Sequence, residues 1–218
     1  MTTGIRIVAF DFDGTVVDSM GGFADLAGEI LAREHGLSVD EGRRRYRDTS
    51  GLPFFLQLDE LFPSHPDNPR LAAEFEARKL EGFFRQTWFP DVPDALSRLR
   101  AGGVITAVCS NNSEENVRTF VQRRRAETGV TFDHVLGFRP GFQKGPPHFD
   151  HLLQVEGATR DQLLLVGDSL KDAEKAVSYG IGFVARTGTF GRADFEARFP
   201  GFPVVDSLAA LPSLLGLP

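Results

Sequence analysis

Four short hydrophobic runs, each followed by polar or glycine residues, are the most regular feature of this sequence. They are Ile5–Phe10, Val104–Cys109, Leu163–Val166 and Ile181–Ala185. Continuous apolar runs of this length are typical of strands buried on both faces, as in parallel sheets. Amphipathic helical patterns alternate with the later runs, and glycines such as Gly180 stand where a left-handed helix cap is expected. The pattern predicts an α/β protein with a Rossmann-like parallel sheet covered by helices.

The region between the first and second runs breaks this rhythm. From Met20 to Phe89 the hydrophobic positions follow helical spacing only, with a proline-containing loop at Pro63–Pro69. A block of this length is too long for a simple crossover between strands. We therefore expect a helical cap at residues 19–89, inserted after the first strand, and a catalytic core made of residues 1–18 and 90–218. The alternative, extra helices packed on one face of a single domain, stays open at this point.

Acidic residues follow two of the predicted strands. Asp11 and Asp13 come directly after the first run, and Asp168 and Asp172 come after the third. Ligands of open parallel sheets bind beyond the carboxyl ends of the strands, and alternate residues of an extended chain point the same way. Carboxylates held this close repel one another unless a cation relieves them, and oxygen ligands suit magnesium. Taken singly, each cluster could equally be an Asp turn or a helix cap.

Two further sequence features are weak evidence for a phosphate site when each is taken alone. Ser110, Asn111 and Asn112 follow the second run, where a hydroxyl and free backbone amides could hold a phosphate, although such residues also begin ordinary helices. Lys144 precedes a helical pattern, and a lone lysine is more often a solvated surface residue. They gain weight only as members of an ordered set.

That ordered set resembles the four motifs of the haloacid dehalogenase superfamily. The matching segments are DFDGTVVDS at 11–19, CSNNS at 109–113, Lys144 and GDSLKDAEKA at 167–176. The resemblance covers the whole predicted core, with the helical insertion where this family carries a small cap. It implies an enzyme, a phosphatase. The acid two residues after the first aspartate goes with phosphate chemistry in this family, whereas true dehalogenases lack it.

The resemblance implies a role for each motif residue. Asp11 would be the nucleophile that becomes phosphorylated, and Asp13 would be the general acid and base. Mg²⁺ would be held by Asp11, Asp168 and the backbone carbonyl of Asp13, with Asp172 close by.

The same resemblance assigns the phosphate contacts. Ser110 and the backbone amide of Asn111 would bind the phosphoryl oxygens, with Thr15 as a further substrate-binding residue. Lys144 would neutralise charge around Asp11 and the phosphate. The expected substrate is a small phosphorylated metabolite. Two residues depart from the family pattern: Gly145 follows Lys144 where many relatives have Pro, and Asp91 stands where relatives often have Gly.

Substrate choice is expected to depend on the cap. The segment Arg43–Arg47 followed by Gly51-Leu52-Pro53 is similar to the cap of phosphoglycolate-phosphatase-like members. An arginine fork could bind a substrate carboxylate, and Arg47, nearest the Gly-Leu-Pro turn, is our candidate. A solvated helix face is the alternative for most of these arginines.

Other activities remain open on the same residues. A sugar-phosphate phosphomutase could use the same core, but its typical cap motif is not evident. A phosphonate hydrolase would need a cap lysine in a His-rich setting, which Lys79 lacks. A non-catalytic binding module would not need all four motifs, and a phosphoacceptor signalling domain would place its nucleophile after a later strand.

Charge and cysteine content narrow the partners and the compartment. The net charge of −6 over 218 residues gives no general attraction to nucleic acid or to anionic membranes. The single cysteine, Cys109, lies inside an apolar run, which favours packing over reactivity. No apolar run near the start is long enough to span a bilayer. We therefore expect a cytoplasmic protein without nucleic-acid or membrane partners. The sequence leaves its oligomeric state unknown.

Overall fold

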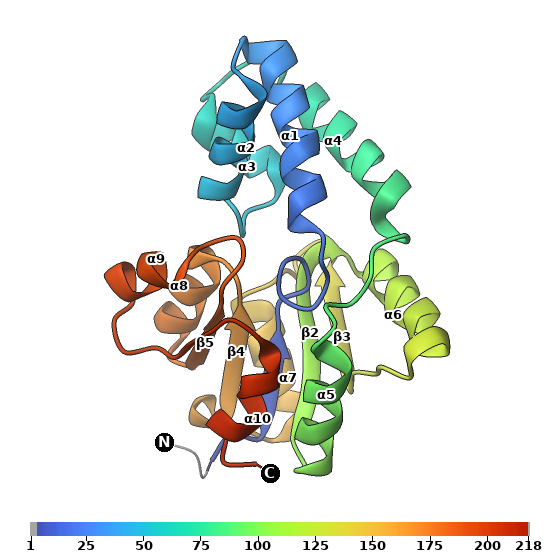
Figure 1. Ribbon diagram of the computed structural model, residues 1–218, viewed down its shortest axis with the longest axis vertical. Helices are drawn as coiled ribbons and strands as arrows, with labels where there is room; N and C mark the ends of the chain where they lie inside the picture. The colour runs from blue at the N-terminus through green and yellow to red at the C-terminus, as the bar shows by residue number, and fades with distance from the viewer. Residues whose placement is uncertain (1–3, 218) are drawn as a thin grey trace. The chain divides into compact units, whose positions relative to one another are not determined.

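The computed structural model describes residues 4–217, which divide into two compact units (Figure 1). We call residues 4–17 together with 87–217 the sheet unit, and Asp18–Gln86 the helical unit. The sequence placed the two breaks after residues 18 and 89. The returning chain joins the sheet unit slightly earlier, because Trp88 forms an antiparallel bridge with Val17 and the Phe89 N–H donates to the Val16 carbonyl at 3.0 Å.

A six-stranded, fully parallel sheet forms the centre of the sheet unit, with strand order β3-β2-β1-β4-β5-β6 within residues 4–217. The strands are β1 (Ile7–Phe10), β2 (Ile105–Ser113), β3 (His134–Phe138), β4 (Leu163–Gly167), β5 (Gly182–Arg186) and β6 (Val204–Val205). Each of the four predicted runs is a strand, and the α/β class with a parallel sheet is confirmed. The strands β3 and β6 were not predicted.

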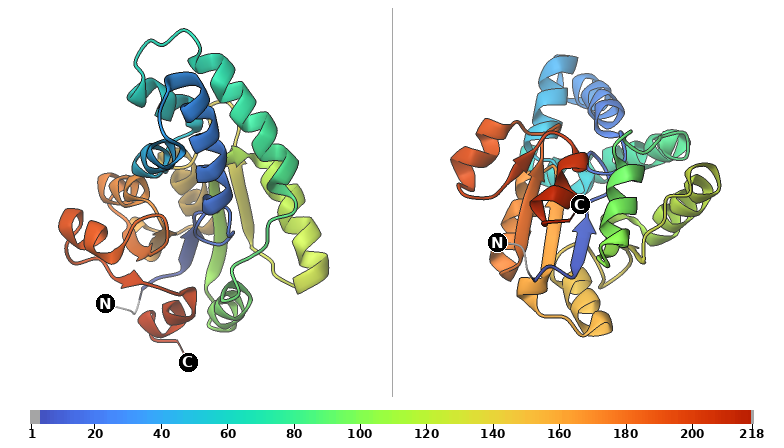
Figure 2. Two further views of the ribbon diagram at one scale, coloured as in Figure 1. Left: turned by 45° about the horizontal axis from the view of Figure 1, so that its top comes forward. Right: turned by 60° about the horizontal axis from the view of Figure 1, so that its bottom comes forward.

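Helices cover both faces of this sheet (Figure 2). They are α5 (Val92–Ala101), α6 (Glu114–Thr128), α7 (Pro146–Glu156), α8 (Leu170–Tyr179), α9 (Arg192–Arg198) and α10 (Leu211–Leu214), with short 3₁₀ turns η1 (Arg160–Gln162) and η2 (Leu208–Ala210). Ile7 and Ala9 of β1 belong to one core cluster with Phe149 of α7 and Ala173 of α8. Phe10, which alternates with them, contacts Phe132 instead. The central strand is therefore buried on both sides.

The second strand is longer and less regular than the predicted run. Its pairing with β3 shifts register between Cys109 and Ser113, so the polar residues after Cys109 lie in extended chain rather than at a helix start. The neighbouring strand allows this through Gly137, where a Cβ would lie 2.3 Å from the Glu114 Cα atom and 2.9 Å from the Asn112 carbonyl oxygen. Only glycine tolerates backbone this close.

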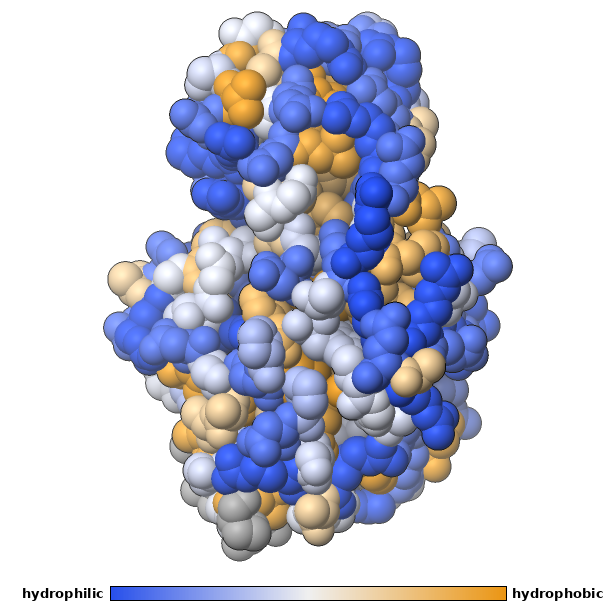
Figure 3. All heavy atoms as spheres, turned by 45° about the vertical axis from the view of Figure 1, so that its right-hand side comes forward, coloured by the Kyte–Doolittle hydropathy of each residue, from blue (hydrophilic) through white to orange (hydrophobic). Residues whose placement is uncertain are grey.

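The helical unit has a hydrophobic core of its own. It consists of α1 (Met20–His35), α2 (Val39–Asp48), α3 (Phe54–Leu61) and α4 (Asn68–Phe83). Phe54 and Phe75 stack at 4.1 Å between ring centroids, inside a cluster that also contains Phe23 and Leu31. The predicted proline loop is shorter than expected, because Pro69 lies in the first turn of α4, where a missing N–H costs no hydrogen bond. Hydrophilic residues cover most of the face of this unit seen in Figure 3.

Among the helices within residues 4–217, none has both the length and the hydrophobicity needed to cross a bilayer.

Candidate active site

The turn after β1 brings Asp11 to the carboxyl end of the sheet. The Asp11 N–H donates to the Val166 carbonyl of β4 at 2.8 Å, so the residue stays in line with the sheet. The chain then turns sharply, with the Gly14 N–H donating to the Val17 carbonyl at 2.9 Å. Gly14 has φ 75°, a conformation that side-chain-bearing residues rarely adopt. A glycine at this position therefore holds the Phe12–Val17 loop closed beside Asp11.

Three buried carboxylates form a cluster at this edge. Asp11, Asp168 and Asp172 each offer an oxygen atom, and these atoms lie within 4.8 Å of one another. The cluster forms because β1 and β4 are neighbours and end together, with Phe10 beside Val166. Ser169 fixes Asp172 on the first turn of α8: its Oγ donates to Asp172 Oδ2 at 2.7 Å and accepts from the Asp172 N–H at 3.1 Å.

Lys144 is the cation nearest to this cluster, and Lys175 Nζ lies further away, 4.0 Å from Asp172 Oδ1. Its Nζ atom lies 2.7 Å from Asp11 Oδ1 and 2.7 Å from Asp172 Oδ1, and its side chain is buried. The Lys144 backbone N–H donates to Asn111 Oδ1 at 3.2 Å, which ties this loop to the end of β2. Burial opposes a charged amine, but Asp11 and Asp172 together raise the pKa of Lys144 above its ordinary value. The lysine is therefore charged in the folded protein.

The cluster carries more negative charge than Lys144 balances. Burial raises the pKa of Asp11 well above its ordinary range, although Lys144 works against this. Burial, with Asp172 beside it, raises the pKa of Asp168 to about 6. Asp172 differs, because Lys144 and Lys175 bring its pKa below the ordinary value despite burial. Hard carboxylate oxygens with excess charge are the donors that a divalent cation requires, so these residues fit such an ion.

Two threonine hydroxyls orient Asp168. Thr15 Oγ1 donates to Asp168 Oδ1 at 3.0 Å, and Thr189 Oγ1 donates to Asp168 Oδ2. Thr15, which the sequence led us to expect at the substrate, is fully buried and directs its hydroxyl to this carboxylate. Sequence reasoning missed Thr189, although it follows β5 closely and the rule of strand ends could have found it.

The end of β2 contacts the other aspartate of the turn. Asn112 Nδ2 donates to Asp13 Oδ2 at 2.5 Å, and the Asn112 N–H donates to Ser110 Oγ at 3.0 Å. Asn112 holds the Asp13 carboxylate in one orientation; the sequence grouped it with Ser110 and Asn111 as a possible phosphate-binding segment and did not predict this contact. Ser110 is buried beside it.

The candidate specificity arginine lies in the helical unit. Arg43, Arg44 and Arg45 all pair with carboxylates of that unit at 2.7–2.8 Å. Arg47 is exposed, and within residues 4–217 its side chain forms no ion pair.

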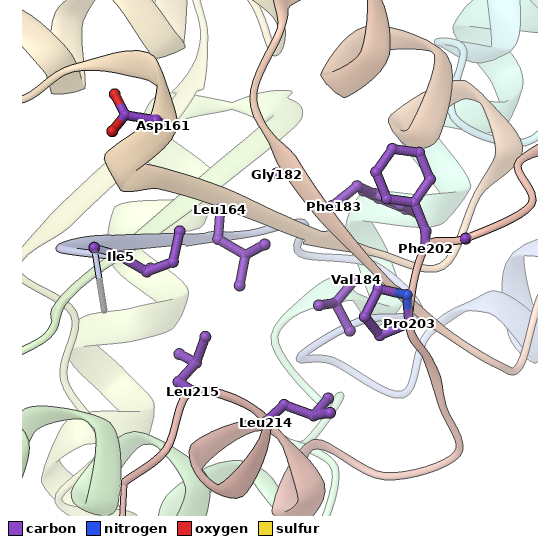
Figure 4. A pocket seen from close by; sticks show the side chains of 12 residues that line it. Ile5, Asp161, Leu164, Gly182, Phe183, Val184, Phe202, Pro203, Leu214 and Leu215 are labelled. Atoms are coloured by element: carbon purple, nitrogen blue, oxygen red, sulfur yellow. The ribbon is translucent and has the colours of Figure 1, made fainter. Parts of the chain in front are cut away.

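A cavity of about 560 Å³ lies near the opposite, amino-terminal ends of the strands (Figure 4). Apolar side chains such as Leu164, Val184 and Leu215 line it, and Asp161 lies at its margin with its carboxylate turned away from them. A phosphate site needs positive or amide donors, which this lining does not supply. The chemistry is therefore assigned to the carboxyl ends of the strands.

Known proteins match the chain over most of its length. A family model described as haloacid dehalogenase-like hydrolase matches residues 8–186. The phosphoglycolate phosphatase of Salmonella typhi is 29% identical over 242 aligned positions, covering 98% of this chain and 94% of that protein.

Solved structures show the same fold at lower identity. A haloacid dehalogenase-like family hydrolase from Streptococcus pneumoniae superimposes with a TM-score of 0.79 at 21% identity, over 96% of this chain and 98% of that one. The protein CbbY from Rhodobacter sphaeroides, solved in complex with phosphate, gives a TM-score of 0.70 at 18% identity, over 95% of this chain and 96% of that one.

Proposed function

The chain belongs to the haloacid dehalogenase-like hydrolases and is a phosphatase of that family, and from this we propose that it hydrolyses a small phosphate monoester through a phospho-aspartate on Asp11, with Mg²⁺ as its cation. The family resemblance predicted from the sequence is thereby confirmed. The observation that carries the mechanistic proposal is the buried Asp11 carboxylate, 2.7 Å from Lys144 and next to Asp168 and Asp172.

Asp11 performs the first displacement in this proposal. One of its oxygens attacks phosphorus, the bond between phosphorus and the ester oxygen breaks, and an acyl phosphate forms on Asp11. Lys144 supports this step, since a phosphate dianion approaches a carboxylate only where positive charge compensates both. Its ammonium group already touches Asp11 and is fixed by burial.

Asp13 moves the proton. As an acid it protonates the departing ester oxygen, and as a base it then takes a proton from the water that attacks the acyl phosphate and regenerates Asp11. Asn112, which donates to Asp13 Oδ2, keeps this carboxylate in a fixed direction. The products are an alcohol and inorganic phosphate.

We assign the cation to Asp11, Asp168 and the Asp13 backbone carbonyl, with Asp172 beside them. When bound, Mg²⁺ would neutralise negative charge on Asp11 and on the phosphoryl oxygens. Thr15 and Thr189 support this arrangement through their bonds to Asp168. We propose that Thr15 serves the site through that carboxylate.

Phosphate binding falls to the end of β2 in this proposal. The Ser110 hydroxyl and the Asn111 amide donate to the phosphoryl oxygens, as suits a strand end with free donors. CbbY, a protein of the same fold, was solved in complex with phosphate, which agrees with phosphate as a ligand in this proposal.

We further propose that the helical unit acts as the cap and selects the substrate. It is inserted between β1 and α5 and has its own core, so it can vary without disturbing the sheet. Arg47 would bind a carboxylate on the substrate. Phosphoglycolate, the substrate in the relatives' name, has such a group, and small phosphorylated carboxylic acids are our proposed substrate class.

The test is release of inorganic phosphate from a panel of small esters with Mg²⁺. The panel pairs 2-phosphoglycolate with esters of similar size that lack the carboxylate, such as ethyl phosphate. We expect hydrolysis that favours the carboxylated member and stops in a chelator. Conversion of a sugar phosphate to its isomer without phosphate release would instead favour a phosphomutase.

A further inference from the structure

Arg186, the last residue of β5, reaches the turn that carries the catalytic aspartates. Its side chain is 7% exposed, and Nη1 donates to the Thr15 carbonyl at 3.0 Å. Its guanidinium lies over the Phe89 ring, 4.0 Å from the centroid. Stacking on one face and donation at the edge fix a planar guanidinium in a way that a lysine could not reproduce.

Asp91 holds the other side of this arginine. Its Oδ1 atom lies 3.2 Å from Arg186 Nη1, and its Oδ2 accepts from the Ser207 hydroxyl and the Leu208 N–H, both at 2.7 Å. Burial alone would raise the pKa of Asp91, but these bonds and the Arg186 charge bring it below its ordinary value. Asp91 is one of the departures from the family pattern noted above, and the structure gives it a partner.

These contacts continue into the acidic cluster. Arg186 holds the Thr15 backbone, and the Thr15 hydroxyl holds Asp168 Oδ1 at 3.0 Å. Thr15 lies within the short loop after Asp11, which is closed by the Val16 and Val17 N–H groups donating to the Phe12 carbonyl at 3.0 and 2.9 Å. A shift of this loop therefore moves Asp11 and, through the Thr15 hydroxyl, the Asp168 carboxylate.

We propose that Arg186, held by Asp91, is a positioning residue that sets the affinity of the acidic cluster for a divalent cation. The inference rests on the proposed function for the identity of that cation. Some side chains hydrogen-bond to metal ligands without touching the metal. Removing such a side chain typically changes metal affinity by about 10–100-fold. Arg186 is connected to Asp168 only through Thr15, so we expect a change near the 10-fold end of that range.

A second arginine of the sheet unit provides a matched control. Arg192 pairs with Asp206 at 3.2 Å and donates to the Val204 carbonyl at 2.8 Å, so it also joins a carboxylate and a backbone oxygen. Its contacts are exposed, and its partner Asp206 accepts from Thr187 Oγ1, which lies outside the turn at residues 11–17. An effect that reflects only the loss of an arginine–aspartate pair would appear in both variants.

The experiment measures Mg²⁺ binding to metal-stripped protein by calorimetry. We expect Arg186→Gln to raise the Kd for Mg²⁺ about 10-fold and Arg192→Gln to leave it unchanged. Asp91→Asn should raise it less, and the double variant Asp91→Asn/Arg186→Gln should equal Arg186→Gln, since the two side chains act as one unit. Arg186→Lys, which keeps the charge but not the planar fork, should fall between wild type and Arg186→Gln.

An unchanged Kd in folded Arg186→Gln overturns the proposal, as does an equal change in Arg192→Gln. If Arg186→Gln does not fold, Asp91→Asn decides, and a wild-type Kd there overturns it. A wild-type protein that binds Mg²⁺ but hydrolyses no ester contradicts the proposed function, while the Kd comparison still decides the role of Arg186. A wild-type protein that binds no Mg²⁺ overturns both.

Discussion

Nζ of Lys144 lies 2.7 Å from Oδ1 of Asp11, although 133 positions separate the two residues in the chain. Both side chains are buried, and the same ammonium group is also 2.7 Å from Asp172 Oδ1. One cation thus bridges two carboxylates that would otherwise repel each other. From this pairing we expect Lys144 to be needed both for the stability of the site and for the proposed chemistry.

Replacing Lys144 by Gln should destabilise the metal-free protein and remove turnover. Breaking a buried pair leaves uncompensated charge, which costs about 3–5 kcal/mol. Urea unfolding in chelator measures the loss of stability, and phosphate release measures turnover. Lys171→Gln on α8 is the control, since its pair with Glu174 at 3.0 Å is partly exposed and worth about 0–1 kcal/mol. Equal losses in the two variants would contradict the role of Lys144.

The two aspartates of the turn should fail in different ways. Asp11→Asn should abolish turnover, because an amide is a poor nucleophile. Asp13→Asn should retain phosphate binding but lose roughly 10²–10⁴-fold in rate, the usual effect of removing a general acid–base. Rapid-quench detection of phosphate on the protein separates the two. A nitrophenyl ester should rescue the first step in Asp13→Asn, so phosphoprotein should accumulate. Phosphorylation of Asp11→Asn at the site would be the contrary result.

Mg²⁺ should stabilise the folded protein through Asp168. At a concentration 100 times the Kd, a ligand that binds only the folded state adds about 2.7 kcal/mol. Asp168→Asn should lose most of this gain in a thermal unfolding series with and without Mg²⁺. Asp161→Asn, which changes a carboxylate at the opposite end of the sheet, should keep it. A full Mg²⁺ effect in Asp168→Asn would remove this residue from the cation site.

Arg47→Ala should raise KM for carboxylated esters and leave kcat nearly unchanged. Losing a charge-assisted hydrogen bond of about 1.5–3 kcal/mol corresponds to a KM increase of roughly 10–100-fold. The KM for ethyl phosphate should not move, because that substrate lacks the carboxylate. Arg44→Ala on the same helix is the matched control, since Arg44 is already paired with Glu41 and Asp48. A KM unaffected by Arg47→Ala would leave selection to other residues.

His148 should make the protein less stable in mild acid. It is fully buried, its Nε2 lies 3.1 Å from the Gly137 carbonyl oxygen, and burial lowers its pKa to about 4. The unfolded chain takes up a proton near pH 6.5 and the folded chain does not, so stability is full above that pH and falls as pH drops toward 4. The loss between pH 7 and 5 is about 2 kcal/mol.

His148→Gln provides the comparison for this acid effect. Urea unfolding of wild type and variant at both pH values gives a difference in which other titrating groups cancel. That difference should shrink at pH 5. A constant difference would mean that His148 is protonated in the folded state as readily as in the unfolded one.

The sequence predicted the central strands because burial on both faces leaves a plain signal. Ile7–Phe10 and Leu163–Gly167 are flanked by neighbours on each side, so nearly every position is apolar. His134–Phe138 at the sheet edge is only partly buried and contains Gly137, and Val204–Val205 is a strand of two residues. Neither has a pattern long enough to distinguish it from a loop.

The residues of the candidate site also fall into those that the sequence could predict and those that it could not. Asp11 and Asp168 stand directly at strand ends, where sequence and topology give their neighbourhood. Asn112, Thr189 and Arg186 act through bonds to other side chains or to backbone, and such pairings depend on the fold of distant segments. Asn112 also lies in the irregular part of β2, whose register no local pattern encodes.

The position of β1 in the middle of the sheet determines when, during synthesis, the sheet can be completed. Ile7 pairs with Ile105 on one side and with Leu163 on the other, so the first strand synthesised waits for nearly three quarters of the chain before both its edges are covered. Pairings between such distant segments close slowly, and an open strand edge is a template for aggregation in the meantime. A nascent chain halted before β4 would carry Asp11, the proposed nucleophile, without Asp168 or Asp172 beside it. If the proposed function is correct, hydrolysis can therefore begin only after synthesis has passed β4, because that strand precedes Asp168 and Asp172.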